Sequence, residues 1–325
     1  MSTKNEAVRK KSGVERNLLY SNVAYDSAFR TMESECDDIL IPFVNYLFCE
    51  SYRDDAVVSR MRNEQFSGDR NHSSQKRITD SNFRITQDGV SKSYHLECES
   101  KPYDGSLLVR FFEYDSQIAK ADSDIEFSKL KVRIPNAGLL LLRGPDSVPD
   151  RVCIEIETPE GSVSYHVAVV KESDFTIDKI FEKRLYLMIP FYIFNYEKDL
   201  SDINKDEDRI KALTDFYKDI IAKLDEEHEQ GRLSALSHGV IIRLTHSVIH
   251  KFLMKYKNVQ KKVGDVMGGE VLDLPEIRIA HEAEARGMMK ERVRSEAERK
   301  TLQAEIDALR KENERPKRNA AKIKS

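Results

Sequence analysis

The sequence has few of the residues that mark fibrous, secreted or membrane proteins. Its 325 residues include only 13 Gly and 9 Pro, which excludes collagen-like and linker-dominated chains. Its four cysteines form no CxxC pair and no zinc-ligand spacing, which is typical of reduced thiols. The longest apolar run, residues 185–194, contains Pro190 and has about half of the roughly 20 residues that a membrane helix requires. The first residues carry no apolar signal region, so we expect a cytoplasmic protein without membrane association.

No excess of one charge sign covers the whole chain. The 53 Lys and Arg residues against 56 Asp and Glu give a net charge of −3, which excludes a uniformly basic nucleic-acid coat protein. The charge is nevertheless uneven along the sequence. Residues 278–325 contain 14 basic and 9 acidic side chains, a net charge of +5, so the preceding 277 residues carry −8. Five basic residues and no acid follow Glu314, which predicts either extra phosphate contacts or a solubilising tail.

The periodicity of apolar residues divides the chain into four segments. We expect a mobile N-terminus over residues 1–20, a mixed α/β domain over 21–200, a helical region over 201–270, and a charged helix with a basic tail over 271–325. Helical periodicity covers residues 27–48, 106–121, 206–229, 233–257 and 275–314. Strand patterns cover residues 130–135, 138–143, 152–158 and 163–170, with a hairpin turn at 159–161.

The long charged helix has a stripe at coiled-coil spacing. The stripe consists of Leu302, Ile306, Leu309 and Asn313 and covers about two heptads. It predicts a coiled coil and a homodimer formed through the C-terminal helix. A helical interaction protein that works mainly through this region is therefore one alternative to an enzyme.

Residues 77–101 form the most informative segment. Asp88 and Gly89 stand between two runs of period two, which is a strong signal for a two-residue β-hairpin turn. Such a turn fixes the register, so that the numbers of paired residues sum to 177. One side then holds the pairs Phe83–Tyr94, Ser81–Leu96 and Thr79–Cys98, and the other holds Asn82–His95, Asp80–Glu97 and Ile78–Glu99. A slip by one residue would move every side chain to the wrong face.

This register predicts a carboxylate cluster. Asp80 would lie opposite Glu97, with Glu99 and Lys101 further along the same strand face. Like charges that face each other destabilise a sheet unless a cation compensates them. Carboxylate oxygens suit Mg²⁺ or Mn²⁺, and a divalent ion held by Asp80 and Glu97 could activate water for attack on a phosphoryl group. The alternative is an edge hairpin whose acids simply face water.

The order of several short motifs resembles a known family. An Asp26-Ser-Ala-Phe29 helix start is followed by Ile78-Thr-Asp80, by residues 94–100 (Tyr-His-Leu-Glu-Cys-Glu-Ser), and by residues 108–117, which contain Arg110 and Gln117. Residues 156–161, 187–194 and 266–269 continue the similarity. Over roughly residues 20–290, the chain resembles the PD-(D/E)XK nuclease family transposases, the recombination-promoting nuclease group.

The resemblance implies a restriction-endonuclease-like mixed sheet flanked by helices over residues 21–200, and Mg²⁺-dependent cleavage of DNA tied to recombination or transposition. By position, Asp80 matches the metal-binding aspartate and Glu97 the acidic residue of the (D/E)xK element. The third position, a Lys in the superfamily and often a Gln in this group, is Glu99 here. Lys101, two residues further on, is a candidate substitute, because residues two apart lie on one strand face. A DNA-binding or assembly module without catalysis is the alternative that Glu99 favours.

Further candidate residues come from the helices. Arg110, Glu113, Gln117 and Lys120 form a polar stripe on the helix predicted for residues 106–121. The resemblance implies that this helix packs behind the active-site strands, so Arg110 and Gln117 would contact a DNA phosphate or orient the site. A solvated face of an amphipathic helix is the alternative.

Two other groups of polar residues are candidate metal ligands. Asp26 is a candidate additional acid because it falls in the matching helix-start motif, while Glu33, Glu35, Asp37 and Asp38 form a cluster in which no residue is singled out. His246 and His250 lie four residues apart without the glutamate of an HExxH motif. They are therefore interpreted as packed or surface histidines.

Overall fold

The computed structural model describes residues 25–61, 64–66, 76–78, 81–145 and 147–267. All of these belong to one compact unit, residues 1–271. The predicted mobile N-terminus, the coiled-coil helix and the basic tail lie outside the described residues, as does Asp80. No helix in the described ranges is both long and apolar enough to cross a membrane.

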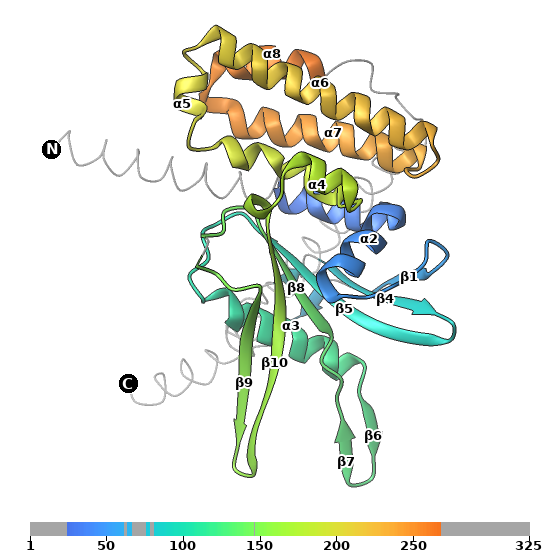
Figure 1. Ribbon diagram of the computed structural model, residues 1–325. Coiled ribbons are helices and arrows are strands. Elements are labelled where there is room, and N and C mark those ends of the chain that lie inside the picture. Colours follow the sequence, from blue (N-terminus) through green and yellow to red (C-terminus); the bar gives the residue numbers. More distant parts are fainter. Residues whose placement is uncertain (1–24, 62–63, 67–75, 79–80, 146, 268–325) are drawn as a thin grey trace, which may run out of the picture. The chain divides into compact units, whose positions relative to one another are not determined.

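A six-stranded mixed sheet forms the centre of this unit (Figure 1). Its strands, in spatial order, are β1 (Val57–Arg60), β4 (Ser81–Gln87), β5 (Val90–Glu99), β8 (Asn136–Leu141), β10 (Gly161–Lys171) and β9 (Arg151–Thr158). The β5–β8 and β8–β10 pairs are parallel and the other pairs are antiparallel. The prediction of a mixed α/β fold with a sheet flanked by helices is therefore confirmed.

The hairpin of β4 and β5 has the predicted register. Ser81 pairs with Leu96, Phe83 with Tyr94 and Gln87 with Val90. Asp88 and Gly89 form the turn with φ of 52° and 77°, the left-handed values that a two-residue turn of this kind requires.

In the described residues the ladder of β4 and β5 begins at Ser81, and the predicted pairs of Thr79 with Cys98 and of Asp80 with Glu97 involve residues outside that description. The predicted pair of Ile78 with Glu99 is wrong. Ile78 pairs instead with Glu64 in a separate two-stranded sheet of β2 (Glu64–Phe66) and β3 (Lys76–Ile78). Glu99 pairs with Leu141 of β8. Strands β3 and β4 thus belong to different sheets, which a continuous period-two pattern does not reveal.

The single helix predicted for residues 27–48 is two helices, one over residues 25–35 and α2 (Asp37–Phe48). Cys36 between them has φ −125° and ψ 79°, which is not helical. The break leaves the carbonyl of Glu33 to the Arg60 guanidinium, whose Nε lies 3.1 Å from that oxygen. A side chain from β1 thus takes the hydrogen bond that a continuous helix would have used.

Helices cover both faces of the sheet. Leu107 and Phe111 of α3 (Leu107–Ala121) pack on Ala137, Leu139 and Leu141, the odd-numbered side of β8. Gly138 lies on the other side, beneath Leu47 and Phe48 of α2. Because residues at the same level of parallel β5 and β8 share a face, His95 and Glu97 point toward α3 and Leu96 toward α2.

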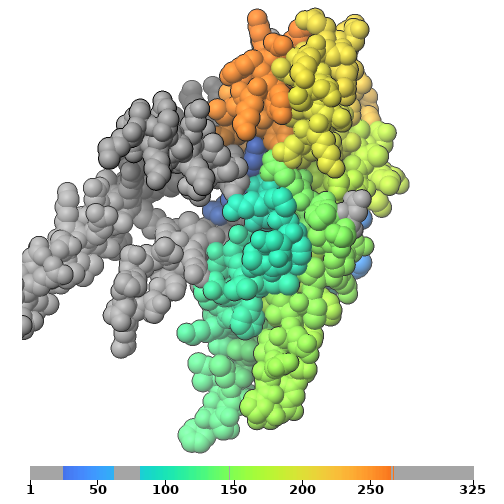
Figure 2. Space-filling view, turned by 90° about the vertical axis from the view of Figure 1, so that its left-hand side faces the viewer, coloured from blue at the N-terminus to red at the C-terminus, as the bar shows by residue number. Residues whose placement is uncertain are grey.

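Two hairpins extend from the sheet side of the unit (Figures 1 and 2). The hairpin of β9 and β10 closes at Thr158 and Gly161, as the turn at 159–161 predicts. The strand predicted at residues 130–135 is shorter, and β7 (Lys129–Lys131) pairs with β6 (Asp124–Glu126) away from the main sheet.

The remaining helices lie at the α2 side of the sheet. The elements are α4 (Ile177–Glu182), the 3₁₀ segment η2 (Tyr186–Tyr196), α5 (Leu200–Ile203), α6 (Glu207–Glu229), α7 (Ala235–Phe252), η3 (Leu253–Lys255) and α8 (Lys257–Met267). The helix predicted for residues 206–229 is confirmed, whereas the one predicted for 233–257 ends at Phe252. The apolar run of residues 185–194 is buried except for the partly exposed Tyr192, and all of it after Leu185 lies in η2.

Candidate functional site

The candidate site lies where the last residues of β5 meet α3 and the first helix. Glu97 is its central carboxylate, with a side chain that is only 3% exposed. A carboxylate at such depth is costly unless it is paired and hydrogen-bonded. Two cationic side chains, His95 and Arg110, provide that pairing.

His95 connects Glu97 to α3. Its Nε2 lies 3.1 Å from Glu97 Oε1, and its Nδ1 lies 2.7 Å from Asp115 Oδ1. The His95 and Asp115 side chains are both fully buried. Burial opposes protonation of the imidazole, but its hydrogen bonds to Asp115 and Glu97 outweigh that effect and raise the pKa of His95 to about 9. The tyrosine hydroxyl of Tyr165, on β10, donates to Asp115 Oδ2 at 3.0 Å.

Arg110 brings a second cation from α3. Its Nη2 lies 2.9 Å from Glu97 Oε2 and 3.2 Å from Glu99 Oε2. The Arg110 side chain is 38% exposed, so this cation links the buried carboxylate to the surface. Arg110 was predicted from the resemblance as a phosphate contact, and the structure places it directly on the two predicted acids.

Lys101 does not lie on the face of β5, because the strand ends at Glu99. Its backbone N–H donates to Glu99 Oε1 at 2.9 Å, and its side chain is exposed. Pro102 follows, and a proline has no N–H with which to continue a strand ladder. The predicted placement of Lys101 along the strand is therefore wrong, and Arg110 occupies the position next to Glu99.

The first helix contributes Asp26. This half-buried carboxyl has its pKa raised to about 6, chiefly by burial, with Arg30 acting in the opposite direction and Glu99 and Glu97 adding to the rise. The negative charges of Glu99 and Glu97 therefore act on the Asp26 carboxyl. The role of Asp26 as an additional acid of the site stays a prediction.

Glu33, two turns after Asp26 in the same helix, is the buried member of the four-acid cluster. Burial raises the pKa of Glu33 to about 7, and Arg60 opposes the rise. Its Oε1 lies 3.7 Å from Arg60 Nε. The structure thus singles out Glu33 among four acids that the sequence could not rank.

Gln117 lies two turns after Arg110 on α3. Its Oε1 is buried and accepts no hydrogen bond from the residues that the structure describes. The histidines at 246 and 250 lie apart from these residues, on α7, with ring centroids 6.2 Å from each other. Burial, together with His250, lowers the pKa of His246.

The donor chemistry fits a hard divalent cation. Glu97, Glu99 and Asp26 supply carboxylate oxygens, the ligands that Mg²⁺ and Mn²⁺ prefer. Within the described ranges, no group of three or more His, Cys, Asp or Glu side chains is placed to hold a metal ion. The protein's own cations, His95 and Arg110, contact the two oxygens of Glu97.

Comparisons with protein-family models, with curated proteins and with solved structures found no match. The family resemblance of the sequence motifs therefore stays a prediction.

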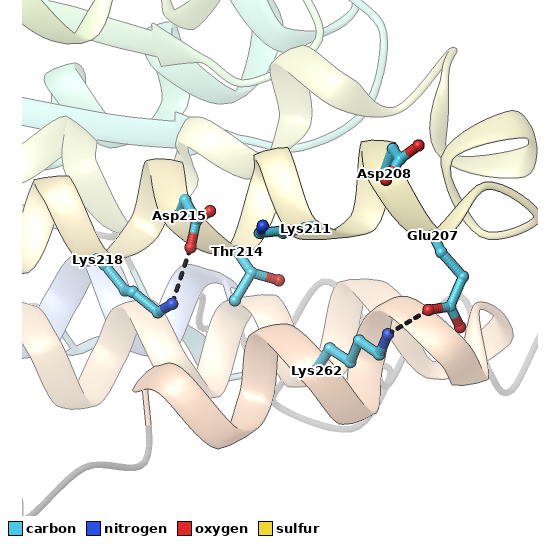
Figure 3. Close-up of a pocket in the computed structure, with 7 residues that line it drawn as sticks. All are labelled: Glu207, Asp208, Lys211, Thr214, Asp215, Lys218 and Lys262. Atoms are coloured by element: carbon cyan, nitrogen blue, oxygen red, sulfur yellow. Dashed lines mark hydrogen bonds and ion pairs between the residues drawn. The ribbon is translucent and has the colours of Figure 1, made fainter.

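A surface groove on α6 and α8 contains none of the predicted site residues (Figure 3). Its side chains form exposed ion pairs, with Lys218 Nζ 2.8 Å from Asp215 Oδ1 and Lys262 Nζ 2.9 Å from Glu207 Oε2. Exposed pairs of this kind contribute little to stability. The mixed charge of the groove offers no concentrated field for an anionic or cationic ligand.

Sequence reasoning did not identify His95, Asp115 or Tyr165 as site residues. A signal for Asp115 was present, since Leu107, Phe111, Asp115 and Ile118 share the buried face of α3. A carboxylate on the apolar side of an amphipathic helix requires a buried partner. The hairpin register placed His95 on the same face as Glu97, and the two observations together would have identified the pair.

Proposed function

We propose that this protein is a divalent-metal-dependent deoxyribonuclease of the PD-(D/E)XK type, acting in recombination or transposition. The observation that carries the proposal is the convergence of Glu97, Glu99 and Arg110 at the end of β5. The element order also supports a restriction-endonuclease-like fold. A helix precedes the antiparallel strands β1, β4 and β5, and α3 then leads to β8, which is parallel to β5.

The roles follow from the chemistry of each side chain. Glu97 and Asp80 would hold Mg²⁺ or Mn²⁺, because the confirmed register, continued by one residue, predicts that they face each other. A divalent cation, when bound, supplies positive charge that stabilises the charge developing on a phosphoryl oxygen. Asp26 adds a further oxygen donor at the edge of the site.

Arg110 supplies the cationic group that the third motif position lacks. Its guanidinium reaches Glu99 and Glu97 from α3 and is partly exposed, and a DNA phosphate would approach it from the exposed side. An arginine suits this role, because its planar fork matches phosphate oxygens and keeps its charge at any physiological pH. Glu99 accepts from both Arg110 and the Lys101 backbone, and would take the proton from the attacking water.

The second candidate is a DNA-binding or assembly module without catalysis. One observation favours it: both carboxylate oxygens of Glu97 already contact protein cations. In that case the His95–Glu97–Arg110 contacts would be a stabilising network within an inherited nuclease fold. DNA would then be bound but not cut.

Plasmid cleavage separates the two candidates. Purified full-length protein is incubated with supercoiled plasmid in Mg²⁺, Mn²⁺ or EDTA, and we expect nicking or cutting only with metal. Glu97→Gln and Asp80→Asn should reduce cleavage to the EDTA level, because each loses the negative charge that binds the cation. Glu157→Gln, at an exposed acid of β9, is the matched control and should cut as the wild type does.

An intact plasmid in every metal, together with a gel shift of the same DNA, would support the binding module instead. Cleavage by Glu97→Gln at the wild-type rate would remove Glu97 from the mechanism.

A further inference from the structure

Three elements meet in a polar chain behind Glu97, of which His95 and Asp115 are fully buried and Tyr165 is partly buried. His95 comes from β5, Asp115 from α3 and Tyr165 from β10. The links are Tyr165 Oη to Asp115 Oδ2 at 3.0 Å, Asp115 Oδ1 to His95 Nδ1 at 2.7 Å, and His95 Nε2 to Glu97 Oε1 at 3.1 Å. Every link is within hydrogen-bonding distance.

The contacts on the two ring nitrogens fix the orientation of the imidazole. Nδ1 of His95 faces Asp115 Oδ1 and Nε2 faces Glu97 Oε1. The ring plane is therefore set by Asp115 on one side and Glu97 on the other.

The same contacts set the orientation of Glu97. Oε1 is held by His95 from within the sheet layer and Oε2 by Arg110 from the partly exposed side. Two fixed donors on two oxygens define the carboxylate plane. Side chains that bind metals are commonly oriented by such a second set of hydrogen bonds, and loss of that set typically weakens metal affinity by 10–100-fold.

We infer that His95 is a positioning residue that presents Glu97 to a hard divalent cation, with Asp115 and Tyr165 holding the imidazole in place. The inference rests on the proposed function in that Glu97 is a cation ligand. In addition, the orientation of the Glu97 carboxylate is set by a buried histidine that would contact neither the cation nor DNA. The ligand class is Mg²⁺ or Mn²⁺.

Isothermal titration of the full-length protein with Mn²⁺ measures this role without any need for cleavage. His95→Gln removes the imidazole that holds Glu97 Oε1 and should weaken Mn²⁺ binding by about tenfold or more, because the carboxylate loses its fixed orientation. Asp115→Asn leaves His95 and Glu97 in place and should weaken binding in the same direction, because its only route to the cation is through the ring of His95. Tyr165→Phe, which removes one distal hydrogen bond, should have a smaller effect.

The double variant His95→Gln/Asp115→Asn tests whether the two residues act as one unit. We expect its Mn²⁺ affinity to be no lower than that of His95→Gln alone, since coupled residues in one network are not additive. His246→Gln, on α7 away from this chain of contacts, is the matched histidine control and should bind Mn²⁺ as the wild type does. All titrations are made well below the melting temperature of each variant.

The outcomes are distinct from those of the nuclease proposal. Folded His95→Gln and Asp115→Asn variants that bind Mn²⁺ within twofold of the wild type would overturn the inference, as would additive losses in the double variant. If His95→Gln does not fold, Asp115→Asn alone decides between these results. A wild type that binds no Mn²⁺ would also overturn it. A wild type that binds Mn²⁺ but leaves plasmid intact would reject the nuclease function, while the affinities of the variants would still decide the role of His95.

Discussion

Glu172 is a carboxylic acid enclosed by the protein directly after β10. It is fully buried, and neither of its side-chain oxygens has a hydrogen-bond partner among the described residues. Burial raises its pKa well above the usual value of 4.5. The Tyr217 hydroxyl on α6 is buried and likewise unpartnered within those residues, and its pKa is raised chiefly by burial, with smaller contributions from Tyr196 and Glu172.

Replacement of Glu172 should therefore change how stability depends on pH. The folded-state pKa lies above the unfolded one, so the wild type is unaffected below about pH 4.5 and loses stability as pH rises from there through the folded pKa. Glu172→Gln cannot ionise and should gain melting temperature relative to wild type between pH 4 and pH 8. For a chain of this size, each kcal/mol corresponds to roughly 2–4 °C.

Glu160→Gln, at an exposed residue of the β9–β10 turn, is the control and should show no such trend. Melting curves of all three proteins at several pH values make the comparison. A constant difference between Glu172→Gln and wild type across the range would mean that the pKa of Glu172 is the same in the folded and the unfolded protein.

Some residues of the candidate site could be predicted from the sequence and others could not. The hairpin register identified Glu97 and Glu99 on one face because a two-residue turn fixes every pair beyond it. It could not identify the cation beside them. The spacing along the strand suggested Lys101, whereas Arg110 approaches from α3, and the contact depends on how that helix packs. His95 and Asp115 were missed for the same reason, since each has its partner on another element.

At the scale of elements, the close approach of α2 to the sheet depends on one glycine. A Cβ added to Gly138 of β8 would lie 2.5 Å from Leu47 Cδ2, 2.7 Å from Leu96 Cδ2 and 2.9 Å from Phe48 Cζ. These distances are too short for carbon atoms in contact. The absence of a side chain therefore lets the helix reach the strand.

Gly138→Ala should destabilise the protein by about 1–3 kcal/mol, the usual cost of forcing an extra methyl into a packed core. Gly264→Ala is the matched control, because Gly264 lies within α8 and a Cβ there would meet nothing within 4 Å. That change should instead stabilise by about 0.5–1 kcal/mol through helix propensity. Urea unfolding of both variants measures the two effects, and equal midpoints for wild type and Gly138→Ala would show that α2 can shift without cost.

Element types were predictable where local signals were complete. The turn at Asp88 and Gly89, the helix over α3 and the hairpin of β9 and β10 all carry their own turn or periodicity signals. The break at Cys36 was not predictable, since residues 27–48 keep a helical apolar pattern on both sides of it. The break involves Arg60, which binds the Glu33 carbonyl from a strand 27 residues away. A contact between residues so far apart in the sequence does not change the spacing of apolar residues within a helix.

At the scale of the whole molecule, charge is divided between two parts of the sequence. Residues 1–277 carry a net charge of −8 and residues 278–325 carry +5. An acidic body repels DNA phosphates at long range, and Arg110 alone supplies little affinity for a polyanion. The basic residues after Glu314 therefore have a separate expected role, which is sequence-independent attraction to the DNA backbone.

Deletion of residues 315–325 tests this division. The five basic side chains in that segment can neutralise up to about five phosphates, and counterion release would then give a log–log salt slope of up to about −4.5 on duplex DNA. The truncated protein should bind DNA more weakly at low salt and with a flatter slope. Cleavage at saturating enzyme should stay near the wild-type rate, because Glu97, Glu99 and Arg110 are untouched.

Salt titrations of full-length and truncated protein on one DNA fragment measure both slopes. A variant with the five basic residues changed to Gln is the matched control for chain length, and it should reproduce the deletion if charge alone is responsible. Equal slopes for full-length and truncated protein would remove the tail from DNA binding and would leave Arg110 and its neighbours as the source of phosphate affinity. A flatter slope with unchanged cleavage would instead show that attraction to DNA and the cut itself reside in different parts of the chain.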